Sequence, residues 1–271
     1  MRIIEVLFRL IKNMKKIFLS LFSVIILLGA LYFFWLTPKY TVPILTYHSI
    51  ADAEGNLFVS AENFVKQMEY IKNKGYEVIT LDELVGSIKN KKRFNGKKVV
   101  ITFDDGFQDN FKYAYPVLKK LNFPATIFLA TDYIGKGRGF LSWNEVRIMS
   151  ENNISFGGHT KTHLYLGDVK DDKLTYEEIA GSKKAIEREI GISADYFCYP
   201  IGGFNERVKE IVKEVGYKGA CTTNRGVDRF NNDIYELQRI KVTNSDGSRP
   251  FAFKVKLSGY YNLFRSRKNS Y

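Results

Sequence analysis

Short apolar segments alternate with helical patterns along residues 42–242. Between the apolar segments, residues three and four apart repeat in the way that predicts helices, as over Phe111–Leu121 and Tyr176–Ile190. Strands that alternate with helices form βαβ units around a parallel sheet. Seven or eight such strands favour a distorted or incomplete (β/α) barrel, and a doubly wound open sheet is the alternative. The predicted strands are Val42–Tyr47, Glu77–Thr80, Val99–Phe103, Ala125–Ala130, Ile154–Gly157, Tyr196–Tyr199, Gly219–Thr222 and Arg239–Val242.

Chemically active side chains gather at the carboxyl ends of these strands, where both architectures place their active sites. The chain has three histidines, His48, His159 and His163, and each falls at or just after a predicted strand end. The adjacent pair Asp104 and Asp105 follows another strand, in the sequence ITFDDG. One such residue by itself would be read as structural, but this shared position indicates one common site.

Two neighbouring carboxylates repel each other, so the fold must supply a positive partner. His159 and His163 lie four residues apart in HTKTH. If this segment turns helically, both imidazoles lie on one side and form a pair that can bind a divalent metal such as zinc. One aspartate would complete a three-ligand site with open positions, and the other would stay near water whose pKa the metal lowers.

The N-terminal part of the chain contains a predicted membrane span over residues 17–36, IFLSLFSVIILLGALYFFWL. About 20 apolar residues suffice to cross a bilayer. Lysines precede this stretch, and Tyr32 and Trp35 lie at its far end, so we expect a cytoplasmic N-terminus. The predicted organisation is a cytoplasmic basic segment (1–16), an anchor (17–36), a catalytic domain (37–245) and a basic aromatic tail (246–271). A cleaved signal peptide is the alternative, but no small-x-small cleavage site follows.

The net charge of +12 comes mostly from lysines that are spread along the chain, which is typical of a solvated surface. No nucleic-acid-binding motif accompanies it, and we expect no nucleic-acid partner. Cys198 and Cys221 each lie in an apolar, strand-like stretch. They are predicted to be buried thiols, with a disulfide between neighbouring strands as the alternative.

The motifs TFDDG at 102–106 and HTKTH at 159–163 resemble the first two motifs of the polysaccharide deacetylases (NodB-homology domains, carbohydrate esterase family four). These are metal-dependent hydrolases that remove acetyl groups from glycans on a distorted (β/α) barrel. The resemblance covers roughly residues 42–242. It implies that Asp104 is the catalytic base and that Asp105, His159 and His163 bind one divalent metal ion. Zinc is expected, with cobalt, nickel or iron as alternatives.

The sequence departs from the third family motif, which usually reads Arg-x-Pro-Tyr. The corresponding segment is CYPIG, with Cys198 in place of the arginine and Ile201 in place of the tyrosine. Arg239, in the late strand, is the predicted substitute for the arginine that steadies the base. The backbone N–H of Ile201 is the predicted oxyanion donor, because that role needs no side chain. The alternative is that this segment is an ordinary turn after a strand.

The late Leu-x-His motif of the family, which supplies a general acid, is also missing, because no histidine follows His163. In a barrel the first strand can lie beside the last, so His48 is the predicted general acid, with a structural or substrate-orienting role as the alternative. An early Tyr-His followed by FDDGF and FCYPIG is most similar to the deacetylases of poly-N-acetylglucosamine. Asp109 and Asn110 are predicted to cap the helix that follows the first motif.

Tyr199 and Phe107 are predicted to contact the substrate, and Tyr47 and Trp143 are further candidates for a sugar-stacking groove. For each ring, core packing is the alternative. The predicted protein is a single-pass plasma-membrane enzyme whose extracytoplasmic domain removes N-acetyl groups from a polysaccharide of the poly-N-acetylglucosamine type. Its partners would be the N-acetylated glycan and the membrane, and the oligomeric state stays open. The alternatives are a peptidoglycan N-acetylglucosamine deacetylase and a non-catalytic glycan-binding barrel.

Overall fold

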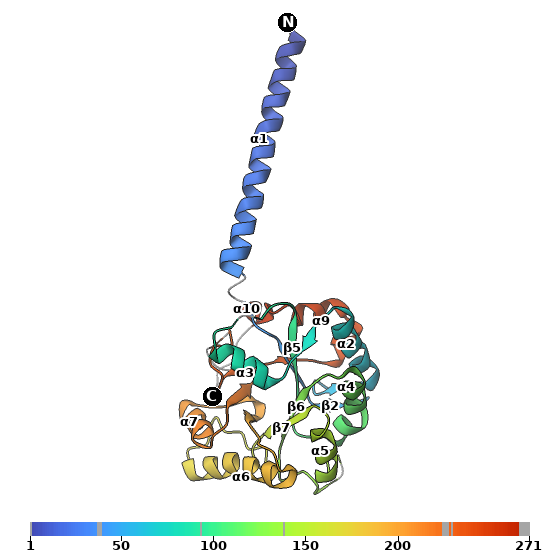
Figure 1. The fold of residues 1–271 in the computed structure, drawn as a ribbon, viewed down its shortest axis with the longest axis vertical. Helices are drawn as coiled ribbons and strands as arrows, with labels where there is room; N and C mark the ends of the chain where they lie inside the picture. Colours follow the sequence, from blue (N-terminus) through green and yellow to red (C-terminus); the bar gives the residue numbers. More distant parts are fainter. Residues whose placement is uncertain are drawn as a thin grey trace. The chain divides into compact units, whose positions relative to one another are not determined.

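Two units make up the chain, Met1–Tyr40 and Thr41–Tyr271. The structure is a computed structural model that describes residues 2–36, 40–92, 94–137, 139–223, 228 and 230–265 (Figure 1). Each unit is described by itself below.

The N-terminal unit is a helix, α1 (Arg2–Ala30), which continues as a π-helical segment, η1 (Leu31–Leu36). Large apolar side chains along it are exposed, among them Phe18 and Leu27. Within the stretch Arg9–Leu36, 18 consecutive residues reach a mean hydropathy of 2.6, so by length and composition this stretch can cross a membrane. The helix already begins at Arg2, and therefore most of the basic segment predicted at 1–16 and the span predicted at 17–36 belong to one helix. Residues 37–39, where the catalytic domain was predicted to begin, lie outside the described residues.

The second unit is built on a nine-stranded sheet whose strands pair in parallel, in the order β10-β9-β8-β7-β6-β5-β1-β11, with β4 beside β5. Every predicted strand is present, with ends that differ by a few residues. A separate short pair joins β2 (Ser49–Ile50) to β3 (Phe58–Val59). The strands of the main sheet are β1 (Ile44–Tyr47), β4 (Glu77–Val78), β5 (Lys98–Phe103), β6 (Ala125–Leu129), β7 (Ile154–Gly158), β8 (Tyr196–Cys198), β9 (Gly219–Thr222), β10 (Leu237–Gln238) and β11 (Ile240–Lys241).

The sheet curls until its two ends meet at residues 237–241. This segment pairs with β9 through β10, and one residue later it pairs with β1 through β11. Arg239 is the residue between the two halves, and its backbone N–H donates to the carbonyl of Thr223 at 2.9 Å. The result is a nearly closed parallel (β/α) barrel, which confirms the predicted fold class over the open sheet. The single strand predicted at Arg239–Val242 is instead two short strands that have different neighbours.

Helices surround the barrel on its outer side (Figure 1). Their ends follow local capping rules: the Ser60 side chain accepts from the N–H of Asn63 at the start of α2, and Ser142 and Glu145 form a capping box at α5. The helices are α2 (Ala61–Asn73), α3 (Leu81–Lys89), η3 (Asn110–Ala114), α4 (Tyr115–Leu121), α5 (Trp143–Ser150), α6 (Asp172–Ile190), η4 (Pro200–Gly202), α7 (Glu206–Glu214), α8 (Asn244–Ser248), α9 (Pro250–Lys256) and α10 (Tyr261–Phe264).

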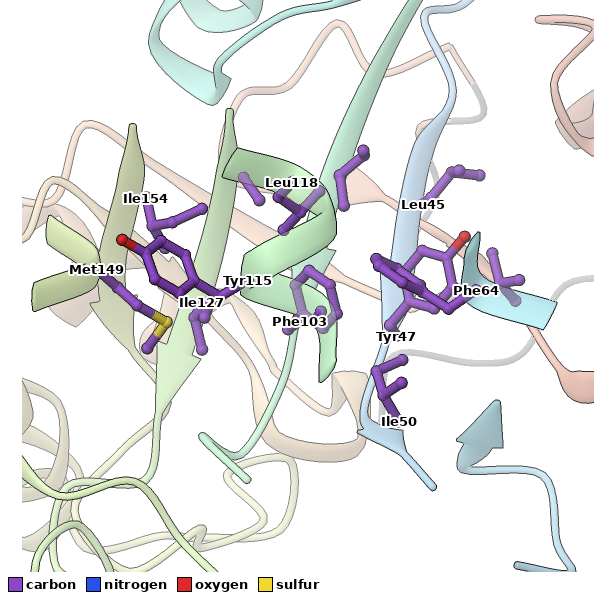
Figure 2. Close-up of a cluster of buried hydrophobic side chains, with 14 of the residues drawn as sticks. Leu45, Tyr47, Ile50, Phe64, Phe103, Tyr115, Leu118, Ile127, Met149 and Ile154 are labelled. Carbon is purple, nitrogen blue, oxygen red and sulfur yellow. The ribbon is translucent and has the colours of Figure 1, made fainter. Parts of the chain in front are cut away.

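Alternation along the strands separates an apolar layer from a polar interior. Leu45 and Tyr47 on β1 and Phe103 on β5 belong to the apolar core that packs against the helices, as Figure 2 shows. The rings of Tyr47 and Phe103 stack with their centroids 5.4 Å apart. The intervening residues Thr46 and Thr102 are also buried, and both contact the polar network inside the barrel. The period-two pattern therefore provides both a core and an interior that can hold charged groups.

The C-terminal segment differs from its prediction. Residues 246–271 were predicted to be a tail outside the catalytic domain, but Phe253 and Leu257 of this segment are buried in the main core. The backbone N–H of Thr41 also donates to the carbonyl of Gly259 at 2.9 Å. The predicted boundary at residue 245 is therefore wrong, because apolar residues of α9 cover one end of the core.

The contribution of α9 can be tested with two phenylalanines on the same helix. Phe253 is 2% exposed and Phe251 is 76% exposed. We expect Phe253→Ala to lower the free energy of unfolding of residues 38–271 by about 3–5 kcal/mol, because it leaves a cavity in the core. Phe251→Ala should change it by less than about 0.5 kcal/mol. Urea unfolding measures both values, and equal effects would show that α9 is not part of the core.

Candidate active site

A tight turn directs the two adjacent carboxylates to different partners. Asp104 follows β5 directly, and its N–H donates to the carbonyl of Tyr47 at 3.0 Å. The next two residues, Asp105 (φ 72°) and Gly106 (φ 78°), both have left-handed backbone conformations. At Gly106 a Cβ atom would lie 2.7 Å from a methyl group of Leu129, so only glycine fits. The turn is how the fold accommodates two like charges at one strand end.

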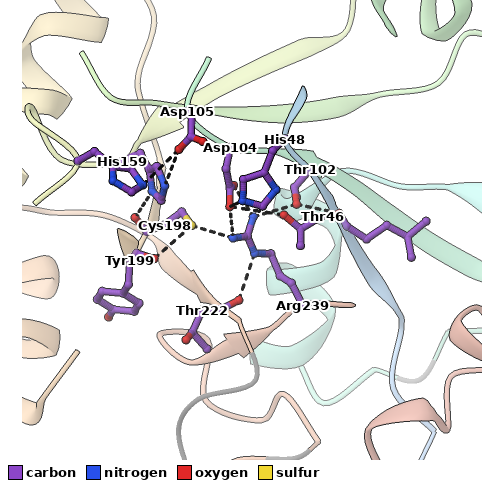
Figure 3. Close-up of polar contacts among 12 residues, drawn as sticks. Thr46, His48, Thr102, Asp104, Asp105, His159, Cys198, Tyr199, Thr222 and Arg239 are labelled. Carbon is purple, nitrogen blue, oxygen red and sulfur yellow. Dashed lines mark hydrogen bonds and ion pairs between the residues drawn. The ribbon is translucent and has the colours of Figure 1, made fainter. Parts of the chain in front are cut away.

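Asp104 is paired with Arg239 inside the barrel (Figure 3). The guanidinium donates from Nη1 to Oδ1 at 2.7 Å and from Nη2 to Oδ2 at 2.6 Å, and both side chains are buried. Burial raises the pKa of Asp104, but the charge and hydrogen bonds of Arg239 outweigh burial and hold this pKa below its usual value. The carboxylate is therefore ionised at neutral pH.

The guanidinium of Arg239 packs beside the small side chain of Cys198. The Cys198 sulfur lies 2.9 Å from Nη2 of Arg239. Arg239 also lies over the ring of Phe128 at 5.5 Å, and its Nε donates to the carbonyl of Thr222. The structure thus brings the predicted substitute arginine to Asp104 from the closing segment, between β10 and β11.

Asp105 faces the two histidines of the second motif. Its Oδ1 lies 3.4 Å from Nε2 of His159 and 3.3 Å from Nε2 of His163. His159 is buried, and its Nδ1 lies 2.7 Å from the carbonyl oxygen of Cys198. Because a carbonyl only accepts, Nδ1 carries a proton, and loss of the proton from Nε2 would leave a lone pair directed at Asp105.

These three residues fit a divalent cation. Oδ1 of Asp105 is buried and makes no hydrogen bond within the described part of the chain. In a tetrahedral site with ligand distances of about 2.0–2.1 Å, neighbouring donor atoms stand roughly 3.3–3.4 Å apart, which is the distance of Asp105 Oδ1 from each imidazole Nε2. A cation among these lone pairs would satisfy all three donors. These three residues therefore form a possible binding site for a divalent metal ion.

The loop that carries the two histidines is not helical, contrary to the expectation for HTKTH. Thr160 and His163 both have left-handed backbones, with φ values of 58° and 59°. The side chain of Glu178 on α6 holds this loop by accepting from the N–H groups of Lys161 and Thr162, at 2.8 and 3.0 Å. The imidazole centroids lie 4.9 Å apart. This proximity comes from a bend in the loop that α6 stabilises, and not from helical spacing.

A second set of donor atoms lies next to the first, in Asp104, His159 and Cys198. Asp104 is already bound by Arg239, and burial raises the pKa of the Cys198 thiol to about 11. A neutral thiol is a poor metal ligand, so this second set is unsuited to a metal at neutral pH. Cys198 and Cys221 are paired in register on β8 and β9, and both are free thiols.

His48 lies in the same cavity, because β1 pairs with the closing segment. Its Nε2 is 3.8 Å from Oδ2 of Asp104. Burial lowers the pKa of His48, and the two aspartates offset this only in part. Asn110 donates to the backbone carbonyl of His48 at 2.8 Å, while Asp109 accepts from the N–H of Ile50. Asp109 was predicted to cap the following helix, but its side chain makes no capping hydrogen bond there. Together with Asn110 it instead holds the segment that carries His48.

The cavity has a volume of about 350 Å³. Ile201 lies at its edge, is 58% exposed and has a φ of 56°, an unusual conformation for a β-branched residue. Basic side chains also line it. The lining residues are Thr46, His48, Leu57, Asp104, Asp105, His159, His163, Ile201, Thr223, Arg239, Lys241 and Arg265.

The structure separates the two aromatic residues that were predicted to contact substrate. Phe107 lines a second hollow beside Asp105 and His163. Tyr199 is fully buried, stacks on Phe204 and donates to the carbonyl of Tyr235, so its prediction as a substrate contact is wrong. Its side chain faces the core beside α7.

Known proteins are similar to this chain in fold and in sequence. A profile of the family described as polysaccharide deacetylase matches residues 91–220. The Bacillus subtilis protein YxkH, which bears the name of a polysaccharide deacetylase, is 33% identical over 202 residues, which cover 74% of this chain and 71% of YxkH. The chain belongs to the polysaccharide deacetylase family.

Two further relatives support this assignment. The poly-beta-1,6-N-acetyl-D-glucosamine N-deacetylase of Staphylococcus aureus (strain MRSA252) is 27% identical over 201 residues, 69% of each chain. The structure of the Streptococcus pyogenes deacetylase PplD, in complex with acetate, superposes with a TM-score of 0.72 at 26% identity, covering 78% of this chain and 97% of PplD. The predicted family is thus confirmed.

Sequence reasoning missed several residues of this polysaccharide deacetylase. Glu178 supports the histidine loop, Thr102 accepts from Nη1 of Arg239 at 3.0 Å, and Lys241 and Arg265 line the cavity. Glu178 is one of many charged residues in a charged helix, and no spacing distinguishes it from its neighbours. Only its burial, at 5% exposed, identifies it.

Glu178 can be tested against its exposed neighbour Glu177. We expect Glu178→Gln to weaken zinc binding by about tenfold, because groups that orient metal ligands typically contribute 10–100-fold to affinity. Glu177→Gln should leave the affinity unchanged. Competition with a zinc-binding dye measures both dissociation constants, and unchanged affinity in Glu178→Gln would show that the loop does not depend on this residue.

The Asp104–Arg239 pair predicts a strong coupling in stability. Arg239→Gln should lower the free energy of unfolding by about 3–5 kcal/mol, because it leaves a buried carboxylate unpaired. Adding Asp104→Asn removes that charge, so the double variant should be less destabilised than the sum of the single variants. Urea unfolding of the four proteins of this double-mutant cycle measures the coupling, and additive effects would contradict it.

Proposed function

We propose that this polysaccharide deacetylase is a metal-dependent N-deacetylase of an extracytoplasmic N-acetylglucosamine polymer. One observation supports it above others: a set of metal-ligand atoms, Asp105, His159 and His163, shares a cavity with an ionised base that is held by an arginine. A non-catalytic glycan-binding barrel needs neither the unpaired ligand atoms nor the buried ion pair.

The reaction adds water across the acetamide C–N bond. A divalent ion, when bound, would polarise the acetyl carbonyl and make water more acidic. Asp104 would take the proton from the attacking water as its oxygen bonds to the acetyl carbon. The C–N bond then breaks, the nitrogen leaves with a proton as a free amine, and acetate is the second product.

The remaining residues of the cavity have distinct proposed tasks. Arg239 orients Asp104 through two hydrogen bonds and keeps it ionised. His48 would deliver the proton to the departing nitrogen, since its Nε2 lies near Oδ2 of Asp104 and can exchange protons with that carboxylate through water. The backbone N–H of Ile201 would stabilise the oxyanion, and the left-handed backbone at this residue supports a constrained role.

The proposed substrate is a polymer of the poly-N-acetylglucosamine type. The named activity of the Staphylococcus aureus relative supports it, as does the early position of the histidine in the sequence. Peptidoglycan is the competing substrate, and product profiles on the two polymers distinguish them.

The proposed location is the outer side of the plasma membrane. The apolar stretch Arg9–Leu36 is long enough to cross the bilayer, and lysines precede its most apolar part. An anchored catalytic unit would act on glycan at the cell surface.

The proposal predicts chelator-sensitive release of acetate from N-acetylglucosamine oligomers. Asp104→Asn should reduce the rate by at least about 100-fold, the usual contribution of a general base, while keeping zinc affinity. His48→Ala should lower kcat by about 100-fold if His48 is the general acid. Enzymatic assay of acetate measures each rate, with residues 38–271 as the protein.

No release with any added divalent metal, by a protein that still binds the oligomers, would contradict catalysis and favour the glycan-binding alternative. A normal rate in His48→Ala would contradict only the assignment of the acid.

A further inference from the structure

A second hollow borders the candidate active site and plays no part in the proposed chemistry. Its volume is about 230 Å³, and it shares Asp105 and His163 with the catalytic cavity. Any group that occupies it therefore lies directly beside the proposed metal ligands. The other residues that line it are Phe107, Ala130, Tyr133 and Phe140.

Three of these residues form what we call the aromatic wall: Phe107, Phe140 and Tyr133. The rings of Phe107 and Phe140 stack with centroids 5.4 Å apart and an angle of 20° between their planes. Phe140 stacks in turn on Tyr133, at 5.0 Å and 18°. Tyr133 is 41% exposed, which is high for a large ring in a folded domain. The wall is thus a continuous row of near-parallel rings beside the reaction centre.

Backbone hydrogen bonds join the wall to the loop of the first motif. The N–H of Leu141 donates to the carbonyl of Gly106 at 2.9 Å, and Phe107 and Phe140 form an antiparallel bridge. Gly106 follows Asp105 directly, so the position of Phe140 is set relative to the proposed metal ligand.

The other end of the wall is joined to the histidine loop. The N–H of Asp132 donates to the carbonyl of Lys161 at 2.8 Å, and Oη of Tyr133 donates to the carbonyl of Thr162 at 3.2 Å. Thr162 precedes His163. The segment after β6 therefore connects both metal-binding loops, and the wall is built before any ligand arrives.

We propose that this hollow is the subsite for the sugar unit next to the one that is deacetylated, and that this unit stacks on the aromatic wall. The inference rests on the proposed function and adds to it the requirement for a chain of sugars. The faces of aromatic rings are electron-rich, and one face of a pyranose ring presents C–H groups that carry partial positive charge. Because the hollow shares Asp105 and His163 with the catalytic cavity, we take its occupant to be a neighbouring unit of the same glycan.

A subsite of this kind should affect long substrates and spare small ones. The neighbouring sugar contributes binding energy only when the substrate is an oligomer. A small aryl ester such as p-nitrophenyl acetate has no second sugar unit, so its hydrolysis reports on the catalytic residues without a neighbouring sugar in the hollow. The ratio of the two activities therefore measures the subsite apart from the chemistry.

The experiment uses the full-length chain, loaded with zinc in detergent. It compares kcat/KM on the N-acetylglucosamine pentamer with kcat/KM on p-nitrophenyl acetate, after subtraction of the Asp104→Asn rate. We expect Tyr133→Ala and Phe140→Ala to lower the pentamer value by about tenfold, which corresponds to about 1.4 kcal/mol, mainly through KM. The ester value should stay within about twofold. Tyr133→Phe keeps the ring and should retain the pentamer activity.

Tyr113 provides the matched control, because it is a tyrosine of similar exposure, 39%, that lies outside both hollows. Tyr113→Ala should behave like the unchanged protein. Equal losses on both substrates, or a loss in Tyr133→Phe as large as in Tyr133→Ala, would overturn the stacking subsite and leave the wall a support for the His163 loop. Unchanged pentamer kinetics in both alanine variants would overturn it as well. If the unchanged protein hydrolyses the ester in an Asp104-dependent way but does not hydrolyse the pentamer, the proposed polymer is wrong. If it hydrolyses neither substrate in an Asp104-dependent way, the proposed function itself is contradicted.

Discussion

The ion pair between Asp104 and Arg239 joins the fold to the chemistry. Arg239 is the residue at which the closing segment leaves β9 and joins β1, and its side chain is directed into the barrel toward Asp104. A buried guanidinium needs a carboxylate, and Asp104 at the end of β5 supplies it. The pair allows a charged base to exist in a buried interior, and it links the last strand of the barrel to one near its start.

The second carboxylate would be difficult to accommodate without a different partner. The left-handed turn at Asp105 and Gly106 directs it to the histidines, where its Oδ1 lies at the distance from each imidazole Nε2 that a tetrahedral cation site requires. Supporting residues hold each loop in place: Glu178 binds the histidine loop, and the segment that carries Tyr133 ties that loop to the first motif. Most of the site is therefore preorganised by ordinary hydrogen bonds to the backbone.

The substitutions in the third motif are explained by which side chains fill the space beside Asp104 in the barrel interior. Where the family pattern has an arginine on β8, this chain has Cys198, and the guanidinium of Arg239 occupies the neighbouring space from another strand. The charge that a buried aspartate requires is kept, although its origin in the sequence has changed. The ring of Tyr199 belongs to the buried core beside β8, so it is not available to contact substrate. The rings that line the second hollow include Tyr133 and Phe140, which follow β6.

The sequence by itself determined the strands, the barrel class and the residues that meet at the strand ends, because apolar periodicity and strand-end position are local properties of the chain. It also indicated His48, from the rule that the first and last strands of a barrel can be neighbours, and Arg239, as the substitute for the arginine that the third family motif lacks here. Only the tertiary structure decided the bend of the histidine loop, the role of Glu178, the packing of Phe253 and the aromatic wall. Each of these depends on contacts between segments that are distant in sequence, and exposed and buried members of one residue type look alike until the chain has folded.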